Sequence, residues 1–287
     1  MSTDTPEPVS IQLGARRERI ALTIGLLLIL LAGIPLFIVT RQDSTFARVQ
    51  VLAHRGASGY APENTMSAFR LAIEQRADWL ELDVQQTKDG HLVVFHDLRM
   101  ERTTNGLGAL RDLTLEQVQA LDAGAWYGPQ FAGERVPTFE EVVALARDHG
   151  IRIFPEVKDP RFYPGIEERV AAVISAYEYE SNTIVQSFDM ASLERLRQIN
   201  PRLRLAALYT SVNPLRTEPP AGVSVVGPPW EMVSADPAIV RDAHANGWQV
   251  VVWSVDSAAE IRPLLEARVD GIITSRPDIV RALLEGR

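Results

Sequence analysis

Short apolar runs alternate with helical segments along most of the chain. The apolar runs are rich in Val, Ile and Leu and have the length of buried strands. We predict strands at residues 51–53, 79–84, 92–95, 151–157, 183–187, 205–209, 223–227, 249–255 and 271–274. Helical patterns lie between most of them, at residues 65–76, 138–149, 165–177, 190–199, 236–246 and 258–267. Strands that alternate with helices in this way favour a parallel sheet covered by helices.

The second and third apolar runs are joined by a tight-turn sequence, KDGH at residues 88–91, so we predict that they form a hairpin. If the loop has two residues, Asp83 lies opposite His96, and if the register shifts by two, Glu81 lies there. Removing the return strand of the hairpin leaves eight strand–helix units. The pattern therefore predicts a TIM-like (β/α)8 barrel, with an open doubly wound sheet as the alternative. No G-x-G-x-x-G follows the first strand, which weakens that alternative.

Residues 98–137 contain no strong strand pattern. They carry several glycines and aromatic residues and one short helical stretch at residues 115–121. We predict that they form a small insertion after the second strand, over the mouth of the barrel or beside it.

The N-terminal part of the chain has a different pattern. Residues 20–40 contain no charged side chain. At about 1.5 Å per residue, a helix of this length spans roughly 31 Å, the thickness of a bilayer core. A buried core helix would be shorter. A cleaved signal peptide would have a shorter apolar run followed by a cleavage site, which is not seen here. The pattern favours a single transmembrane signal anchor.

The charges beside this segment predict its orientation. Arg16, Arg17 and Arg19 precede it, whereas Arg41 follows it. By the positive-inside rule, the N-terminus lies in the cytoplasm and the predicted barrel lies outside it. The predicted organisation is therefore a disordered cytoplasmic tail (1–19), a membrane anchor (20–40), a linker (41–47) and a barrel domain (48–287).

Composition limits the possible functions. The chain has 287 residues and a formal net charge of −8, so a nucleic acid is an unsuitable partner for the surface as a whole. It contains no cysteine, which excludes disulfides, thiolate metal sites and cysteine nucleophiles. A small phosphate ester remains possible, because a local site can capture it.

Carboxylates lie on two neighbouring strands of the predicted barrel. Glu81 and Asp83 are two residues apart on one strand and so face the same side, and Glu156 lies on the neighbouring barrel strand. Carboxylates that share one inward face repel each other unless a cation compensates. Oxygen ligands favour Mg²⁺ or Ca²⁺, so we predict a site for one divalent cation. A plain ion-pair network is the alternative.

Histidines and cations lie on the same predicted rim of the barrel. His54 and His96 both end strands, and two such histidines suit a general base and a general acid. Arg55 and Lys158 could hold phosphate oxygens, or could neutralise the nearby carboxylates. Trp253 could form an apolar wall of the site or fill the barrel as an ordinary core residue.

Eight short motifs occur in an order that resembles the glycerophosphodiester phosphodiesterase family, TIM-barrel enzymes related to PI-specific phospholipase C. The motifs are HRGASG at residues 54–59, PENT at 62–65, ELD at 81–83, VFHD at 94–97, EVK at 156–158, QSF at 186–188, WSVD at 253–256 and DGIIT at 270–274. The resemblance covers residues 51–278. One departure is Ser275, where the family commonly has an acidic residue.

The resemblance implies a TIM barrel with a small insertion after its second strand. It implies an acid/base pair, His54 and His96. It implies three ligands for one Ca²⁺ or Mg²⁺ ion, Glu81, Asp83 and Glu156, and two phosphate-binding side chains, Arg55 and Lys158. In the family's proposed route, the neighbouring hydroxyl of the substrate attacks phosphorus. Water then opens the cyclic phosphate to give sn-glycerol 3-phosphate and an alcohol.

Two other functions use the same residues. A lysophospholipase D or another phospholipase-type hydrolase would act on intact membrane lipids or glycerophosphate polymers. A phosphate-binding protein without activity would have lost a histidine or a carboxylate of the site, and none is missing. The sequence leaves open the preferred alcohol, the identity of the metal and the oligomeric state.

Overall fold

The computed structural model describes residues 1, 49–211, 213 and 219–286. The predicted tail, membrane anchor and linker (1–47) thus lie outside the described residues, Met1 excepted. Within the described part of the chain, none of the helices combines the length and apolar character needed to cross a bilayer.

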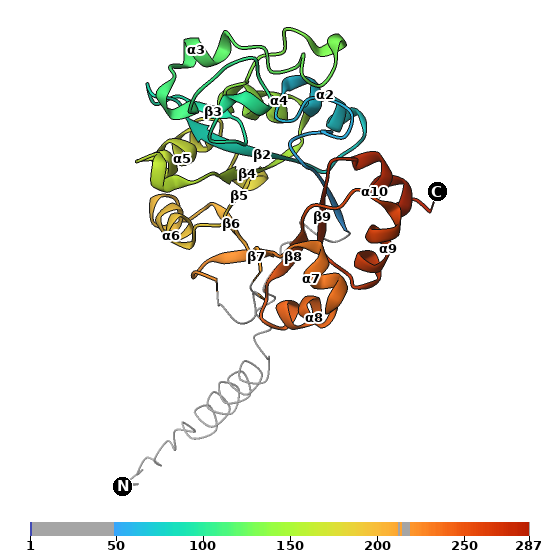
Figure 1. The fold of residues 1–287 in the computed structure, drawn as a ribbon. Helices are drawn as coiled ribbons and strands as arrows, with labels where there is room; N and C mark the ends of the chain where they lie inside the picture. The colour runs from blue at the N-terminus through green and yellow to red at the C-terminus, as the bar shows by residue number, and fades with distance from the viewer. Residues whose placement is uncertain (2–48, 212, 214–218, 287) are drawn as a thin grey trace. The chain divides into compact units, whose positions relative to one another are not determined.

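Eight parallel strands close into a barrel (Figure 1). They are β1 (Gln50–Ala53), β2 (Trp79–Gln86), β4 (Arg152–Val157), β5 (Ile184–Ser187), β6 (Arg204–Leu208), β7 (Val223–Gly227), β8 (Gln249–Val252) and β9 (Gly271–Thr274). Each pairs with its neighbours in chain order, and β1 pairs in parallel with both β2 and β9. This closure confirms the predicted (β/α)8 barrel and excludes the open sheet.

Helices surround the strands on the outside of the barrel (Figure 1). They are α2 (Met66–Glu74), α4 (Phe139–His149), α5 (Ile166–Ala176), α6 (Met190–Ile199), α7 (Trp230–Ala235), α8 (Ala238–Ala245), α9 (Ala258–Glu266) and α10 (Pro277–Leu284), with short 3-10 turns η5 (Pro160–Phe162) and η6 (Glu180–Asn182). As predicted, Thr138 begins α4, where it forms a capping box with Glu141, and Gly150 ends it in the left-handed conformation. The sequence pattern missed α7 and α10.

The hairpin is present, but the predicted register was wrong. Strand β3 (Leu92–Val94) pairs antiparallel with β2, and the Phe95 N–H donates to the Asp83 carbonyl at 2.9 Å. Phe95, not His96, therefore lies opposite Asp83. The reason is the loop, which has three residues and ends in Gly90 at φ +88°.

The insertion between β3 and α4 packs around a small apolar cluster of its own. It contains η2 (Met100–Arg102), η3 (Leu110–Asp112), α3 (Leu115–Gln119) and η4 (Pro129–Phe131). Side chains from β3 and the insertion share this cluster: Val93, Phe95, Met100, Leu110, Val118, Ala123 and Val136. The predicted helix at residues 115–121 corresponds to α3.

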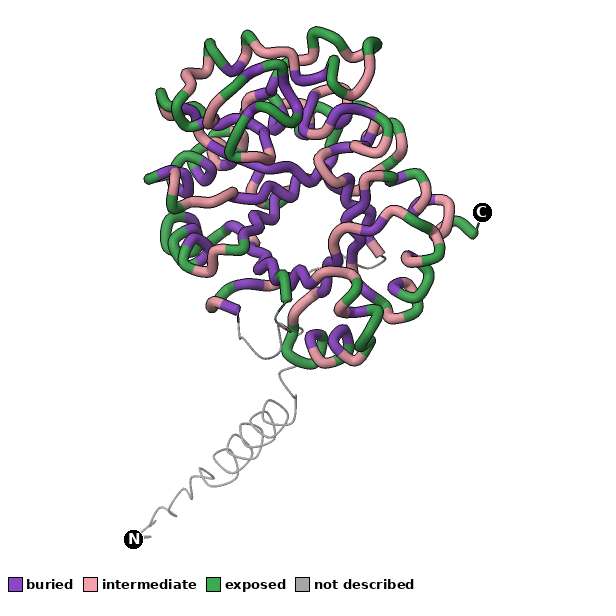
Figure 2. Tube along the Cα trace, in the orientation of Figure 1, coloured by how far each residue is buried: buried purple, intermediate pink, exposed green. Residues whose placement is uncertain are grey.

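Alternation along the strands divides the barrel into two apolar regions. One region lies between strands and helices, and the other fills the barrel interior with one residue from each strand. The interior residues are Leu52, Trp79, Phe154, Ile184, Ala206, Val225, Val251 and Ile273. Figure 2 shows the strands as a ring of buried backbone. This packed interior forms an apolar floor. The next inward-facing side chains, toward the C-terminal ends of the strands, lie above it.

Candidate active site

Three inward-facing carboxylates follow the apolar floor of the barrel. On β2, Trp79, Glu81 and Asp83 are two residues apart and face the same side. On β4, Phe154 and Glu156 are likewise two residues apart and share a face. The parallel register places Asp83 beside Glu156. All three side chains are buried, and one oxygen from each lies within 4.8 Å of the others. The predicted grouping of the three carboxylates is therefore present.

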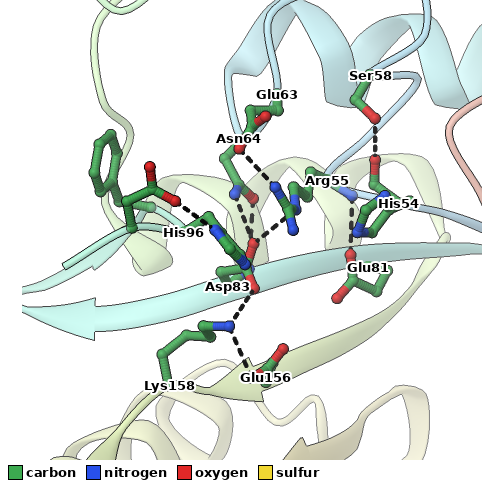
Figure 3. A network of polar contacts seen from close by, with 12 residues as sticks. His54, Arg55, Ser58, Glu63, Asn64, Glu81, Asp83, His96, Glu156 and Lys158 are labelled. Atoms are coloured by element: carbon green, nitrogen blue, oxygen red, sulfur yellow. Dashed lines mark hydrogen bonds and ion pairs between the residues drawn. The ribbon is translucent and has the colours of Figure 1, made fainter. Parts of the chain in front are cut away.

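Two cations contact these carboxylates (Figure 3). Arg55 Nε lies 3.2 Å from Asp83 Oδ2, and Lys158 Nζ lies 3.1 Å from Glu156 Oε1 and 3.7 Å from Asp83 Oδ1. Asn64 also donates its amide N–H to Asp83 Oδ2 at 2.9 Å. Asp83 therefore has more positive and hydrogen-bonding partners than Glu156.

The protonation of the carboxylates follows from these contacts. Burial and the charge of Asp83 raise the pKa of Glu81 well above its usual value. Burial raises the pKa of Glu156 to about 8, although Lys158 opposes the effect. Burial also acts to raise the pKa of Asp83, but Arg55 and Lys158 outweigh it and hold that pKa below its usual value. The three groups do not all ionise easily without a further positive charge.

The donor atoms of this cluster suit a hard divalent cation. Three carboxylates offer oxygen ligands, as Mg²⁺ and Ca²⁺ prefer. Gln186 donates to Glu81 Oε1 at 2.8 Å, while its own side-chain oxygen is buried with no hydrogen-bond partner in the described part of the chain. Three buried carboxylates, two of them with raised pKa values, lie beside this unpaired oxygen, and a bound cation would stabilise such an environment.

Two histidines face the same cavity. His54 follows β1; its N–H donates to the Thr274 carbonyl at 2.8 Å, and its Nδ1 lies 3.4 Å from Ser275 Oγ. Burial, helped by Arg55, lowers the pKa of His54 to about 4. His96 follows β3, its Nδ1 lies 2.6 Å from Asp97 Oδ1, and burial also lowers its pKa. His96 reaches the site despite the changed register, because it lies beyond the last paired residue of β3.

The cavity has a volume of about 200 Å³ and one apolar side. Trp253 lies on this side with Leu208, Ile273 and Phe188, and its indole N–H donates to the Gly227 carbonyl at 2.8 Å. Phe188 packs edge-on against Trp253 with ring centroids 5.5 Å apart, and it is 39% exposed. Trp253 therefore forms a wall of the cavity while also packing against the barrel interior. An adjoining cavity of about 280 Å³ shares Glu156, Lys158 and Phe188 with the first.

The loop after β1 has an unusual backbone. Arg55, Gly56 and Asn64 all have positive φ, at +54°, +82° and +57°. The Asn64 N–H donates to the Arg55 carbonyl at 2.9 Å, and a Cβ on Gly56 would lie 2.6 Å from the Ala68 carbonyl carbon. This geometry turns the Arg55 and Asn64 side chains toward Asp83. The helix predicted at residues 65–76 implied Asn64 as its N-cap, and this was wrong: Thr65 is the N-cap of α2, and Asn64 belongs to the site.

Several residues of the site were not predicted from the sequence. Glu63, Asp97 and Arg102 form ion pairs that connect Arg55 with His96. Glu63 and Asp97 lie within the motifs beside Asn64 and His96, which is a weak signal. Arg102 comes from the insertion, and no strand pattern pointed to it.

Comparison with known proteins gives a consistent result. A family model, the Glycerophosphoryl diester phosphodiesterase family, matches residues 54–279. The chain is 41% identical over 231 residues to a glycerophosphodiester phosphodiesterase of Caldanaerobacter subterraneus subsp. tengcongensis, covering 79% of this chain and 94% of that protein. It is 34% identical over 259 residues to a glycerophosphodiester phosphodiesterase of Bacillus subtilis, covering 83% of this chain and 87% of the relative.

Solved structures share the barrel. A glycerophosphodiester phosphodiesterase from Agrobacterium tumefaciens superposes with a TM-score of 0.71 at 29% identity, covering 82% of this chain and all of the other. A phosphodiesterase from Oleispira antarctica, in complex with the product sn-glycerol-3-phosphate, superposes with a TM-score of 0.73 at 25% identity. That match covers 84% of this chain and 99% of the other.

Proposed function

Because the chain belongs to the glycerophosphoryl diester phosphodiesterase family, we propose that it hydrolyses glycerophosphodiesters to sn-glycerol 3-phosphate and an alcohol. It is a phosphoric diester hydrolase. The observation that carries the proposal is the single cavity that combines three buried carboxylates, two cations and two histidines. The Oleispira antarctica protein, which holds sn-glycerol-3-phosphate, supports a small substrate of this kind.

One divalent cation, Mg²⁺ or Ca²⁺, would be held by Glu81, Asp83 and Glu156. Such an ion supplies Lewis-acid stabilisation of the charge that develops on the phosphate oxygens. Charge balance supports the assignment. With the carboxylates ionised, Arg55 and Lys158 leave the cavity with a net negative charge, which would repel a phosphodiester. A divalent ion reverses that sign.

The remaining side chains would position the phosphate and move protons. Arg55 and Lys158 face the cavity and would bind the non-bridging oxygens. The glycerol hydroxyl next to the phosphate attacks phosphorus and loses its proton to one of the two imidazoles, His54 or His96. The bond from phosphorus to the alcohol oxygen breaks, and the other imidazole, which enters the step in its protonated form, gives that oxygen a proton. Water then opens the cyclic phosphate, with the two proton transfers reversed.

A second candidate activity is hydrolysis of lysophospholipids to a lipid phosphate. The observation that favours it is the half-exposed Phe188, which together with Trp253 forms an aromatic edge to the cavity. Such an edge could contact the acyl chain of a lipid substrate. The products separate the two activities.

We also propose that residues 20–40 anchor the protein in a membrane as a single pass, with the barrel outside the cytoplasm. The support is the uncharged segment and the arginines that precede it. An anchored barrel would work close to the lipid headgroups from which glycerophosphodiesters arise.

The test uses the full chain in detergent. Glycerophosphocholine, glycerophosphoglycerol and a lysophospholipid are supplied with Mg²⁺, with Ca²⁺ or with EDTA, and the products are identified by mass. We expect metal-dependent release of glycerol 3-phosphate, abolished in His54→Ala and Glu81→Ala but retained in His149→Ala, whose imidazole is exposed at the end of α4. Lipid phosphate from the lysophospholipid alone would favour the second activity. No turnover with any metal would contradict both.

A further inference from the structure

An unbroken line of hydrogen bonds and ion pairs connects His96 to Arg55. His96 Nδ1 lies 2.6 Å from Asp97 Oδ1. Arg102 then contacts both oxygens of Asp97, with Nε 2.6 Å from Oδ2 and one terminal nitrogen 3.0 Å from Oδ1. Arg102 also donates to both oxygens of Glu63, at 2.8 and 2.7 Å. Glu63 Oε1 completes the line, 2.8 Å from an Arg55 terminal nitrogen.

Arg102 lies at the centre of this line. It is the residue of the line that belongs to the 98–137 insertion. A guanidinium can bind two carboxylates at once with paired hydrogen bonds, which an ammonium cannot do with the same geometry. Arg102 is not among the residues that line the cavity, so it acts on the site through Asp97 and Glu63. Figure 3 shows the near end of the line, where Glu63 and Asp83 hold Arg55 between them.

The backbone is held in place at both ends of the contact between Arg102 and Asp97. The 3-10 turn that contains Arg102 begins with Met100, which is fully buried in the insertion's apolar cluster. At the Asp97 end, Gln85 donates to the carbonyls of Phe95 and Asp97, at 2.7 and 2.9 Å, and accepts from the Tyr163 hydroxyl. Both ends of the contact between Arg102 and Asp97 therefore belong to rigid segments.

Removing Arg102 would alter the charges next to both proposed active-site groups. Glu63 and Asp97 would each lose their two-point partner. Glu63 would then interact with Arg55 alone, in competition with Asp83, and Asp97 would be free to turn away from His96. The Arg102 side chain is 45% exposed, so solvent screens its ion pairs and limits what they contribute to fold stability. Its effect is on geometry.

We propose that Arg102 is a positioning residue, which sets the imidazole of His96 and the guanidinium of Arg55 in one mutual arrangement. The inference rests on the proposed roles of those two residues. It gives the insertion a function in the site, because the insertion supplies the residue that connects Arg55, after β1, with His96, after β3.

The test compares Arg102→Ala and Arg102→Lys with Arg99→Ala in the full chain. Arg99 is the matched control: it lies just before the same 3-10 turn, is more exposed, and within the described residues forms an ion pair only with Glu101. With glycerophosphocholine we expect kcat to fall about 10- to 100-fold in Arg102→Ala, as is typical when a group behind the directly acting residues is removed. We expect little change in KM or in the unfolding midpoint, and partial recovery of kcat with added guanidinium.

A second readout does not depend on turnover. The imidazole nitrogen resonances of His96, assigned with His96→Gln, should shift in Arg102→Ala and stay as in the wild type in Arg99→Ala. If the wild type hydrolyses no diester, the proposed function fails, and the resonances still test the arrangement. Unchanged resonances and an unchanged kcat in Arg102→Ala would overturn the inference. So would a loss of kcat that only follows a loss of folded protein.

Discussion

At the scale of single residues, neighbouring carboxylates differ because their partners differ. Asp83 forms ion pairs with Arg55 and Lys158 and accepts a hydrogen bond from Asn64. Glu156 forms an ion pair with Lys158. In the metal-free protein Asp83 is therefore ionised, while burial holds the pKa of Glu156 at about 8. If the three carboxylates bind a cation as proposed, they bind it in the ionised form, so metal binding and proton release are coupled.

This coupling predicts how pH changes the effect of the metal on stability. Because the pKa of Glu156 rises from 4.5 to about 8 on folding, the folded metal-free chain keeps a proton that the unfolded chain releases. Its contribution to stability is full below pH 4.5 and is lost as pH rises through about 8. A bound metal offsets this loss. We expect the difference in Tm between Mg²⁺ or Ca²⁺ and EDTA to be larger at pH 8.5 than at pH 6, by calorimetry.

Glu156→Gln is the control for this prediction. The amide does not titrate, so the fall in metal-free stability across this pH range should be smaller than in the wild type. A metal effect on Tm that is equal at both pH values would show that Glu156 does not bind the cation.

Gly56 allows a prediction about the loop that carries Arg55. Gly56 and Gly133 have similar positive φ, +82° and +89°. A Cβ added at Gly56 would lie 2.6 Å from the nearest atom, whereas a Cβ added at Gly133 would meet no atom within 4 Å. We expect Gly133→Ala to cost about 1–2 kcal/mol, the strain of a left-handed residue. Gly56→Ala should cost a further 1–3 kcal/mol or so from crowding. Urea unfolding measures both, and equal losses would contradict the steric argument.

The side chains of the site divide into those that a strand pattern can predict and those that it cannot. His54, Glu81, Asp83, Glu156 and Lys158 lie in or directly after strands, and parallel strands bring their ends to one rim. The position of Arg102 depends instead on how the insertion folds. An irregular segment has no period, so its contacts cannot be read from spacing.

At the scale of elements, the same limit appears in the β2–β3 hairpin. Hydrophobic pattern predicted both strands and their pairing, but the register depends on the loop, and one extra loop residue moves every partner by one. Because side chains alternate along a strand, such a shift moves each predicted inward-facing side chain of β3 to the opposite face. The error did not displace His96 from the site, because β3 ends at Val94 and alternation no longer constrains the residues after it.

Helix α4 supports a prediction at this scale. Thr138 accepts from the Glu141 N–H at 3.2 Å, and Glu141 accepts from the Thr138 N–H at 2.8 Å. We expect Thr138→Ala to lower the free energy of unfolding by about 1 kcal/mol, while Thr138→Ser, which keeps the hydroxyl, changes it little. Denaturant unfolding and kcat are measured together. The capping argument fails if the alanine and serine variants are equally stable.

At the scale of the whole molecule, the barrel and the segment before it make separate contributions. The barrel holds every residue of the cavity, and residues 20–40 hold the predicted anchor. If the two are independent, attachment to a membrane can be lost without loss of chemistry.

Cell fractionation tests this independence. We expect the full chain to sediment with membranes and to resist extraction by high salt or alkaline carbonate, because an apolar span is held by burial in lipid. A chain that begins at residue 48 should be released to the supernatant with an unchanged kcat on glycerophosphocholine. A full chain found in the supernatant would contradict the anchor, and a released chain without activity would show that the barrel depends on the preceding segment.

The pairing of β1 with β9 has a consequence for synthesis. The first and last strands of the barrel are neighbours from Gln50 beside Gly271 to Ala53 beside Thr274, and the His54 N–H bonds to Thr274. A ribosome makes the first strand long before its partner, because the rest of the barrel lies between them in the sequence. One side of β1 thus stays unpaired while most of the domain is translated, and His54 has no fixed position during that time. We expect a nascent chain that stops before β9 to be inert, so that hydrolysis begins only once β9 has been made.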